Sequence, residues 1–87
     1  MIYKIYYTKQ AIEDSRKVSQ SGLKSKVREL IDVLSKNPYQ NTPPYEPLIG
    51  DLTGVLSRRI NIQQRLVYQV IEAERAVKIM RMWSLYQ

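Results

Sequence analysis

The sequence contains no cysteine and no histidine. Without cysteine, the chain has no disulfide framework, no thiol nucleophile and no cysteine-liganded zinc site. Without histidine, it has no Ser-His-Asp triad, no imidazole-liganded metal and no histidine general acid. We therefore expect neither a metal nor a cofactor, and acid-base chemistry would fall to other side chains.

Long apolar runs are also absent. No stretch approaches the roughly 18 residues that a membrane-spanning helix needs, and the first residues lack the apolar segment of a signal peptide. The lack of cysteine fits a reducing compartment. The sequence therefore predicts a soluble, cytoplasmic protein without a membrane partner.

The chain is short and basic. Its 87 residues predict one domain over residues 1–87, since a second core would need roughly twice the length. Hydrophobic residues make up 44%, which excludes a disordered chain. The 14 lysines and arginines outnumber the 8 acidic residues, and the net charge of +6 indicates a polyanionic partner such as nucleic acid or an acidic protein.

The N-terminal part predicts a strand followed by a helix. Ile2–Tyr7 is rich in β-branched and aromatic residues, as strands are. Thr8 is a candidate cap for a helix over about Lys9–Ser19. That helix would bury a thin stripe of three apolar residues, Ala11, Ile12 and Val18. The step Ser21-Gly22 then breaks the chain.

A second helix follows, with the clearest periodicity in the sequence. Five apolar residues recur on one helical face: Leu23, Val27, Leu30, Ile31 and Leu34. Asn37-Pro38 should end this helix. Pro38–Pro47 holds all four prolines and reads as a stiff, extended loop.

The rest of the chain changes to a strand pattern. Val55–Ile60, Arg65–Ile71 and Ala76–Met82 read as three strands joined by short polar turns. The predicted fold class is therefore α+β: an N-terminal strand, two helices, then an antiparallel meander of three to four strands. We expect both helices on one face of the sheet, which leaves the other face open to a ligand.

Basic residues of the predicted strands could bind phosphate on that open face: Arg58, Arg59, Arg65, Lys78 and Arg81. The alternative is an edge-protecting charge or a surface ion pair. Arg58 and Arg59 must point to opposite faces, and Arg59 shares a face with Arg65 if the connection has an odd number of residues. The lysines and arginines of the helices read as a solvated surface.

Three further residues could contribute to a site. Glu46 lies in the stiff loop and could act as a general base beside two guanidinium groups. Near the C-terminus, Trp83 and Tyr86 could stack on bases. For Trp83 we favour the alternative that its large side chain closes one end of the core.

Four motifs then occur in a fixed order: Glu46-Pro47-Leu48, Asp51-Leu52-Thr53-Gly54, Ser57-Arg58-Arg59-Ile60 and Arg65-Leu66-Val67-Tyr68. In this order and spacing they resemble the bacterial YoeB/Txe toxins of the RelE superfamily. The ending Met82-Trp83-Ser84-Leu85-Tyr86 resembles the end of those toxins, which usually close on His-Tyr. The similarity covers most of the chain.

The resemblance implies a RelE-like fold and a ribosome-dependent mRNA endonuclease that cleaves by metal-independent attack of the 2′-hydroxyl. It implies that Glu46 is the base, that Arg65 and Arg59 hold the scissile phosphate, and that Tyr86 orients the nucleotide. We count Arg81 with the substrate-binding cations. The implied partners are an acidic antitoxin encoded alongside, the ribosome with its mRNA, and a second copy of the chain in a homodimer.

One position departs from the family at the site. Leu85 stands where the family's histidine, the proposed general acid, usually lies. Leucine cannot donate a proton, and losing a general acid typically costs about 10²–10⁴ in rate. The chain could be an attenuated variant, which we favour, a natural sequence in which Tyr86 or Arg81 donates, or a degenerate homologue. Asp51 and Gln64 are smaller departures.

Two other functions compete with the nuclease. A catalytically inactive homologue could act as an antitoxin- or RNA-binding module, and Leu85 is the feature in its favour. A DNA-binding transcription factor is supported by the charge alone, because no helix concentrates arginines as a recognition helix does.

Overall fold

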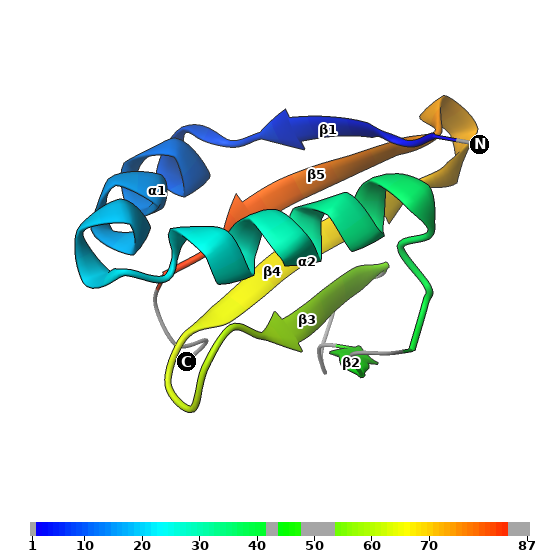
Figure 1. Ribbon diagram of the computed structural model, residues 1–87. Coiled ribbons are helices and arrows are strands. Elements are labelled where there is room, and N and C mark those ends of the chain that lie inside the picture. The colour runs from blue at the N-terminus through cyan, green and yellow to red at the C-terminus, as the bar shows by residue number, and fades with distance from the viewer. Residues whose placement is uncertain (1, 42–43, 48–53, 84–87) are drawn as a thin grey trace.

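The computed structural model describes residues 2–41, 44–47 and 54–83 (Figure 1). Along the chain, its elements are β1 (Lys4–Tyr7), α1 (Lys9–Ser21), α2 (Lys24–Lys36), β2 (Tyr45–Pro47), β3 (Val55–Arg59), β4 (Arg65–Ile71), a 3-10 turn (Glu72–Glu74) and β5 (Ala76–Arg81). No helix in these ranges is long and apolar enough to span a membrane.

The five strands form one sheet in the order β1-β5-β4-β3-β2. β2 to β5 make an antiparallel meander, and β1 lies parallel to β5 at the edge. Both helices lie on the same face of this sheet (Figure 1), where they bury the core. The predicted α+β class, with its meander and its two helices on one face, is confirmed.

Local signals set the ends of the helices as the sequence indicated. Thr8 Oγ1 accepts a hydrogen bond from the Ala11 N–H at 3.0 Å, which caps α1. The Thr8 hydroxyl also donates to the Met80 carbonyl at 2.9 Å and so ties the start of α1 to β5. Gly22 ends the helix with φ of 82°, a left-handed conformation that glycine adopts without steric cost.

Two details of the expected pattern were wrong. Ile12, placed in the core stripe of the first helix, is 50% exposed, and the buried position is that of Asp14. The segment expected to be only an extended loop ends in β2, because Tyr45–Pro47 pairs with β3. An edge strand tolerates Pro47, since an edge residue need not donate to a further neighbour.

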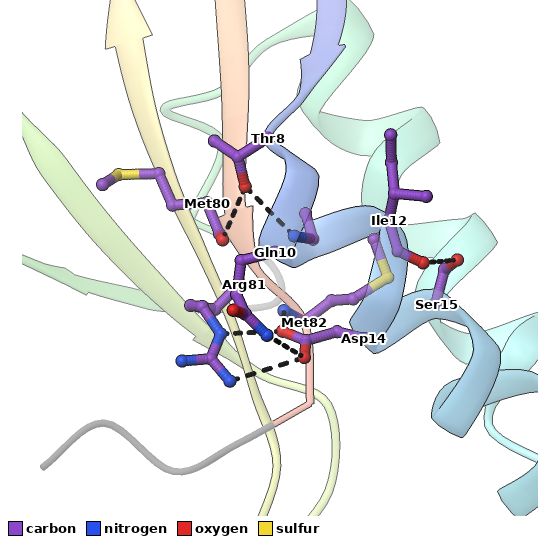
Figure 2. Close-up of polar contacts among 9 residues, drawn as sticks. Thr8, Gln10, Ile12, Asp14, Ser15, Met80, Arg81 and Met82 are labelled. Carbon is purple, nitrogen blue, oxygen red and sulfur yellow. Dashed lines mark hydrogen bonds and ion pairs between the residues drawn. The ribbon is translucent and has the colours of Figure 1, made fainter.

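The buried Asp14 carboxylate joins α1 to the end of β5 (Figure 2). It accepts hydrogen bonds from Arg81 Nε at 2.8 Å, from the Met82 N–H at 3.1 Å and from Gln10 Nε2 at 3.3 Å. Burial alone would raise the pKa of Asp14, but these donors outweigh it and hold the pKa below its ordinary value. We call this arrangement the Asp14 clasp.

Candidate active site

The two neighbouring arginines of β3 point in opposite directions. Arg58 is fully buried on the helix side, where its Nε donates to the Tyr68 hydroxyl at 3.0 Å. Its Nη2 donates to the carbonyls of Pro38 and Gln40 at 3.2 and 2.6 Å. The guanidinium also lies 5.1 Å from the centre of the Tyr45 ring. Arg58 therefore fixes the segment that leads into β2 and is unavailable to a ligand.

Arg59 is exposed on the opposite face of the sheet. It is in register with Arg65 of β4, so the two side chains share that face. The connection runs over residues 60–64, an odd number, and Asn61 Oδ1 shapes it by accepting from the N–H groups of Gln63 and Gln64 at 2.8 and 2.6 Å. The connection therefore has the odd number of residues that the sequence-based prediction required for Arg59 and Arg65 to share a face.

Glu46 completes this arrangement from β2. It is in register with Ser57 of β3, so it projects from the open face as well. Its Oε2 lies 3.9 Å from Arg65 Nη1, and the two side chains are 68% and 25% exposed. Because β3 separates β2 from β4, this ion pair crosses over β3. A candidate base and a candidate phosphate-binding guanidinium are thus adjacent.

A cavity of about 560 Å³ opens at this place. Its walls combine cations, one carboxylate, polar groups and apolar side chains: Lys26, Pro44, Glu46, Ser57, Arg59, Ile60, Asn61, Ile62 and Arg65. We call it the Glu46 pocket. Its volume is in the range of small-ligand sites. Three cations beside a carboxylate suit a ligand that carries negative charge and offers a proton to a base.

The other predicted site residues lie elsewhere. The Glu46 pocket does not include Arg81, which is engaged in the Asp14 clasp, and its role in binding substrate stays a prediction. Leu85 and Tyr86 lie outside the described residues. Trp83 is partly buried and packs against the core. No cluster of metal-ligating side chains occurs within residues 2–41, 44–47 and 54–83.

Among the pocket residues that the sequence did not predict, Lys26 and Ser57 bear on its chemistry. Lys26 was assigned to a solvated helical surface. It lies near the start of α2, and there it forms part of the pocket wall. Ser57 was noted only as part of a motif, although strand alternation places it on the same face as Arg59. That alternation is the signal that could have found Ser57. No sequence pattern could have predicted that Lys26 lies at the sheet edge, because its position depends on how the helix packs.

Comparisons with known proteins agree with the fold and identify the family. Residues 7–86 match the sequence profile of the family described as "YoeB-like toxin of bacterial type II toxin-antitoxin system". The chain is 32% identical to a toxin YoeB of Synechocystis over 73 residues, which cover 82% of this chain and 85% of that protein. It is 39% identical to a toxin YoeB of Streptomyces coelicolor over 57 residues, 66% of this chain, and that match spans only 62% of the relative's length.

A solved relative extends the comparison to structure. The YoeB of Staphylococcus aureus is 31% identical, with 99% of this chain and all of that one covered. The TM-score is 0.80 for its complex with YefM and 0.83 for its dimer. The match over nearly the whole chain, in sequence and in fold, shows that this protein belongs to the family of YoeB-like toxins of bacterial type II toxin-antitoxin systems.

Proposed function

We propose that the chain is an endoribonuclease that cleaves ribosome-bound mRNA by attack of a ribose 2′-hydroxyl on the neighbouring phosphate. The observation that carries this proposal is the pairing of Glu46 with Arg65 in a cationic pocket on the open face of the sheet. A carboxylate can take the proton of the hydroxyl, and an adjacent guanidinium can hold the phosphate that the hydroxyl attacks.

The reaction would use the pocket as follows. Glu46 accepts the proton as the 2′-oxygen bonds to phosphorus, and the bond from phosphorus to the 5′-oxygen breaks. The strand is left with a 2′,3′-cyclic phosphate, and the departing 5′-oxygen takes up a proton. Arg59 and Arg65 stabilise the negative charge that develops on the phosphate oxygens, because a guanidinium fork matches phosphate geometry.

The departing oxygen needs a proton donor, and Leu85 cannot be one. We therefore expect slow cleavage, and Leu85→His should raise the rate by about 10²–10⁴. Primer extension on translating ribosomes measures both rates. The pH profile of the Leu85→His cleavage rate should also gain a limb that the unmodified chain lacks. This limb should fall at alkaline pH, because the imidazolium that donates the proton is lost there. Equal rates would show that another group, such as Tyr86 or Arg81, supplies the proton.

The relatives also suggest partners. A solved complex joins the S. aureus YoeB to YefM, and another structure shows that YoeB as a dimer. We propose that this chain likewise binds an acidic antitoxin, which its net charge of +6 would attract, and forms a homodimer. Co-expression with the protein encoded by the neighbouring gene, which we expect to be small and acidic, followed by size-exclusion chromatography with light scattering, tests both partners.

Leu85 favours a second candidate function. A chain without its general acid could still bind RNA or an antitoxin through the same cationic pocket. If neither the unmodified chain nor Leu85→His cleaves mRNA on ribosomes, the nuclease proposal is wrong and this binding function takes its place.

A further inference from the structure

The hydroxyl of Ser57 is the unexplained group of the Glu46 pocket. Ser57 is only 2% exposed, and its Oγ has no hydrogen-bond partner among the residues that the structure describes. Native proteins contain few such groups, because a buried hydroxyl without a partner loses its hydrogen bonds to water and gains none in return. Alanine would fit the same strand without this cost. A ligand that supplies the missing partner would explain the serine.

The position of Ser57 indicates what that ligand would touch. Glu46 lies directly opposite Ser57 on β2, and Arg65 lies diagonally across on β4, in register with Arg59. The ion pair between Glu46 and Arg65 therefore passes over β3 close to Ser57. By register, Ser57 therefore lies on the strand between the candidate base and the arginine that is the candidate phosphate ligand.

The overlying ion pair is weakly held. Its nitrogen and oxygen are 3.9 Å apart, at the limit of an ion pair, and the Glu46 side chain is 68% exposed. Exposed pairs of this kind are weak and are easily given up for another partner. An anion that bound Arg65 would replace the carboxylate and open the space above Ser57.

We propose that Ser57 Oγ donates a hydrogen bond to a non-bridging oxygen of the phosphodiester that Arg59 and Arg65 bind. This inference rests on the proposed function and adds a substrate contact to it. A phosphate is the ligand that fits best, because cations line the pocket and a hydrogen bond to a charged acceptor is stronger than one to a neutral acceptor. The hydroxyl finds its partner only when RNA is bound.

The test separates binding from cleavage. The probe is a short single-stranded RNA with a 2′-O-methyl group on every ribose, which has no free 2′-hydroxyl and cannot be cut by this route. Its affinity is measured by calorimetry for the unmodified chain, Ser57→Ala and Ser57→Thr, with Ser19→Ala as a control that removes an exposed hydroxyl outside the pocket. Thermal unfolding is recorded for each protein.

We expect Ser57→Ala to bind the probe about tenfold more weakly, the usual cost of one hydrogen bond to a charged group. Its thermal midpoint should stay the same or rise, because an unsatisfied buried hydroxyl has been removed. Ser57→Thr keeps the hydroxyl and should bind within about twofold of the unmodified chain, as should Ser19→Ala. A purely structural serine would instead give weaker folding and equal affinity.

Other outcomes would overturn the inference. Equal affinity of Ser57→Ala and the unmodified chain would do so, whatever the cleavage rates are. Equal loss in the alanine and threonine variants, with lowered midpoints, would assign the effect to packing. No binding of the probe by the unmodified chain would overturn the phosphate site itself. If the probe binds as expected but neither the chain nor Leu85→His cleaves mRNA, only the nuclease proposal fails and the Ser57 contact stands.

Discussion

Two ion pairs join distant elements in the described part of the chain, and they differ in almost every physical respect. In the Asp14 clasp, the carboxylate is fully buried, lies 2.8 Å from Arg81 Nε and accepts three further hydrogen bonds. In the Glu46 pocket, the carboxylate is 68% exposed and lies 3.9 Å from Arg65. One acid is surrounded by its donors, and the other is held loosely.

The difference separates structure from function. A buried carboxylate with all its donors in place is costly to disturb, because removing one partner leaves the other charged and without water. An exposed and distant pair contributes little to folding, so its members can exchange partners with a ligand. We infer that Asp14 holds the fold and that Glu46 and Arg65 are kept available for substrate.

The largest expected effect is on catalysis and comes from Glu46. Glu46→Gln keeps the size of the side chain but removes the base, so cleavage should fall by about 10²–10⁴. The free energy of unfolding should change by about 1 kcal/mol or less, since an exposed pair is lost. Both are measured in a Leu85→His background, where the parent rate is high enough to show the loss. A drop in ribosome binding that equals the drop in cleavage would mark Glu46 as a docking residue instead.

The opposite result is expected for the clasp. Asp14→Asn replaces a carboxylate by an amide whose NH₂ group cannot satisfy all the surrounding donors, so the free energy of unfolding should fall by about 2–3 kcal/mol. Urea unfolding measures this loss. The cleavage rate per folded molecule should be unchanged, and a large loss of rate at unchanged stability would contradict the division between the two pairs.

Acid titration tests the same clasp without a mutation. The folded pKa of Asp14 lies below its ordinary value of 3.8, so the unfolded state binds this proton more readily. The stability due to the clasp is therefore full above about pH 4 and is lost as the pH falls through the folded pKa. The unfolding free energy of Asp14→Asn should depend less steeply on pH in this acid range.

The contrast between the two ion pairs also bears on which features could be predicted from the sequence. Thr8, Gly22 and the apolar period of α2 are local signals, and they predicted the helices and their ends. Alternation along β3 placed Arg58 and Arg59 on opposite faces, and the structure shows that Arg59 is the one that faces the pocket. Strand alternation separated the two arginines but did not choose between them, and the resemblance to the YoeB/Txe toxins is what selected Arg59.

What the sequence could not show depends on contacts between distant residues. The burial of Asp14 follows from Arg81 and Met82, which lie 67 and 68 positions away, and no helix pattern places an aspartate in a core while leaving Ile12 exposed. The place of Lys26 in the wall of the Glu46 pocket likewise follows from how α2 packs over the sheet. Local rules treat such charged helical residues as solvated.

The smallest expected effect compares two lysines of α2. Lys26 lines the Glu46 pocket, while Lys24 lines a different groove, between the two helices. If Lys26 contacts a phosphate of bound RNA, Lys26→Ala should lower affinity for single-stranded RNA a few-fold. It should also reduce the slope of log affinity against log salt by about 0.7, the value for one phosphate contact. Lys24→Ala removes the same charge from the same helix and should change the slope less. Fluorescence anisotropy of a labelled RNA over a range of salt concentrations measures both slopes. Equal changes in the two variants would mean that RNA senses only the net charge of the protein, and that the pocket ends at its two arginines.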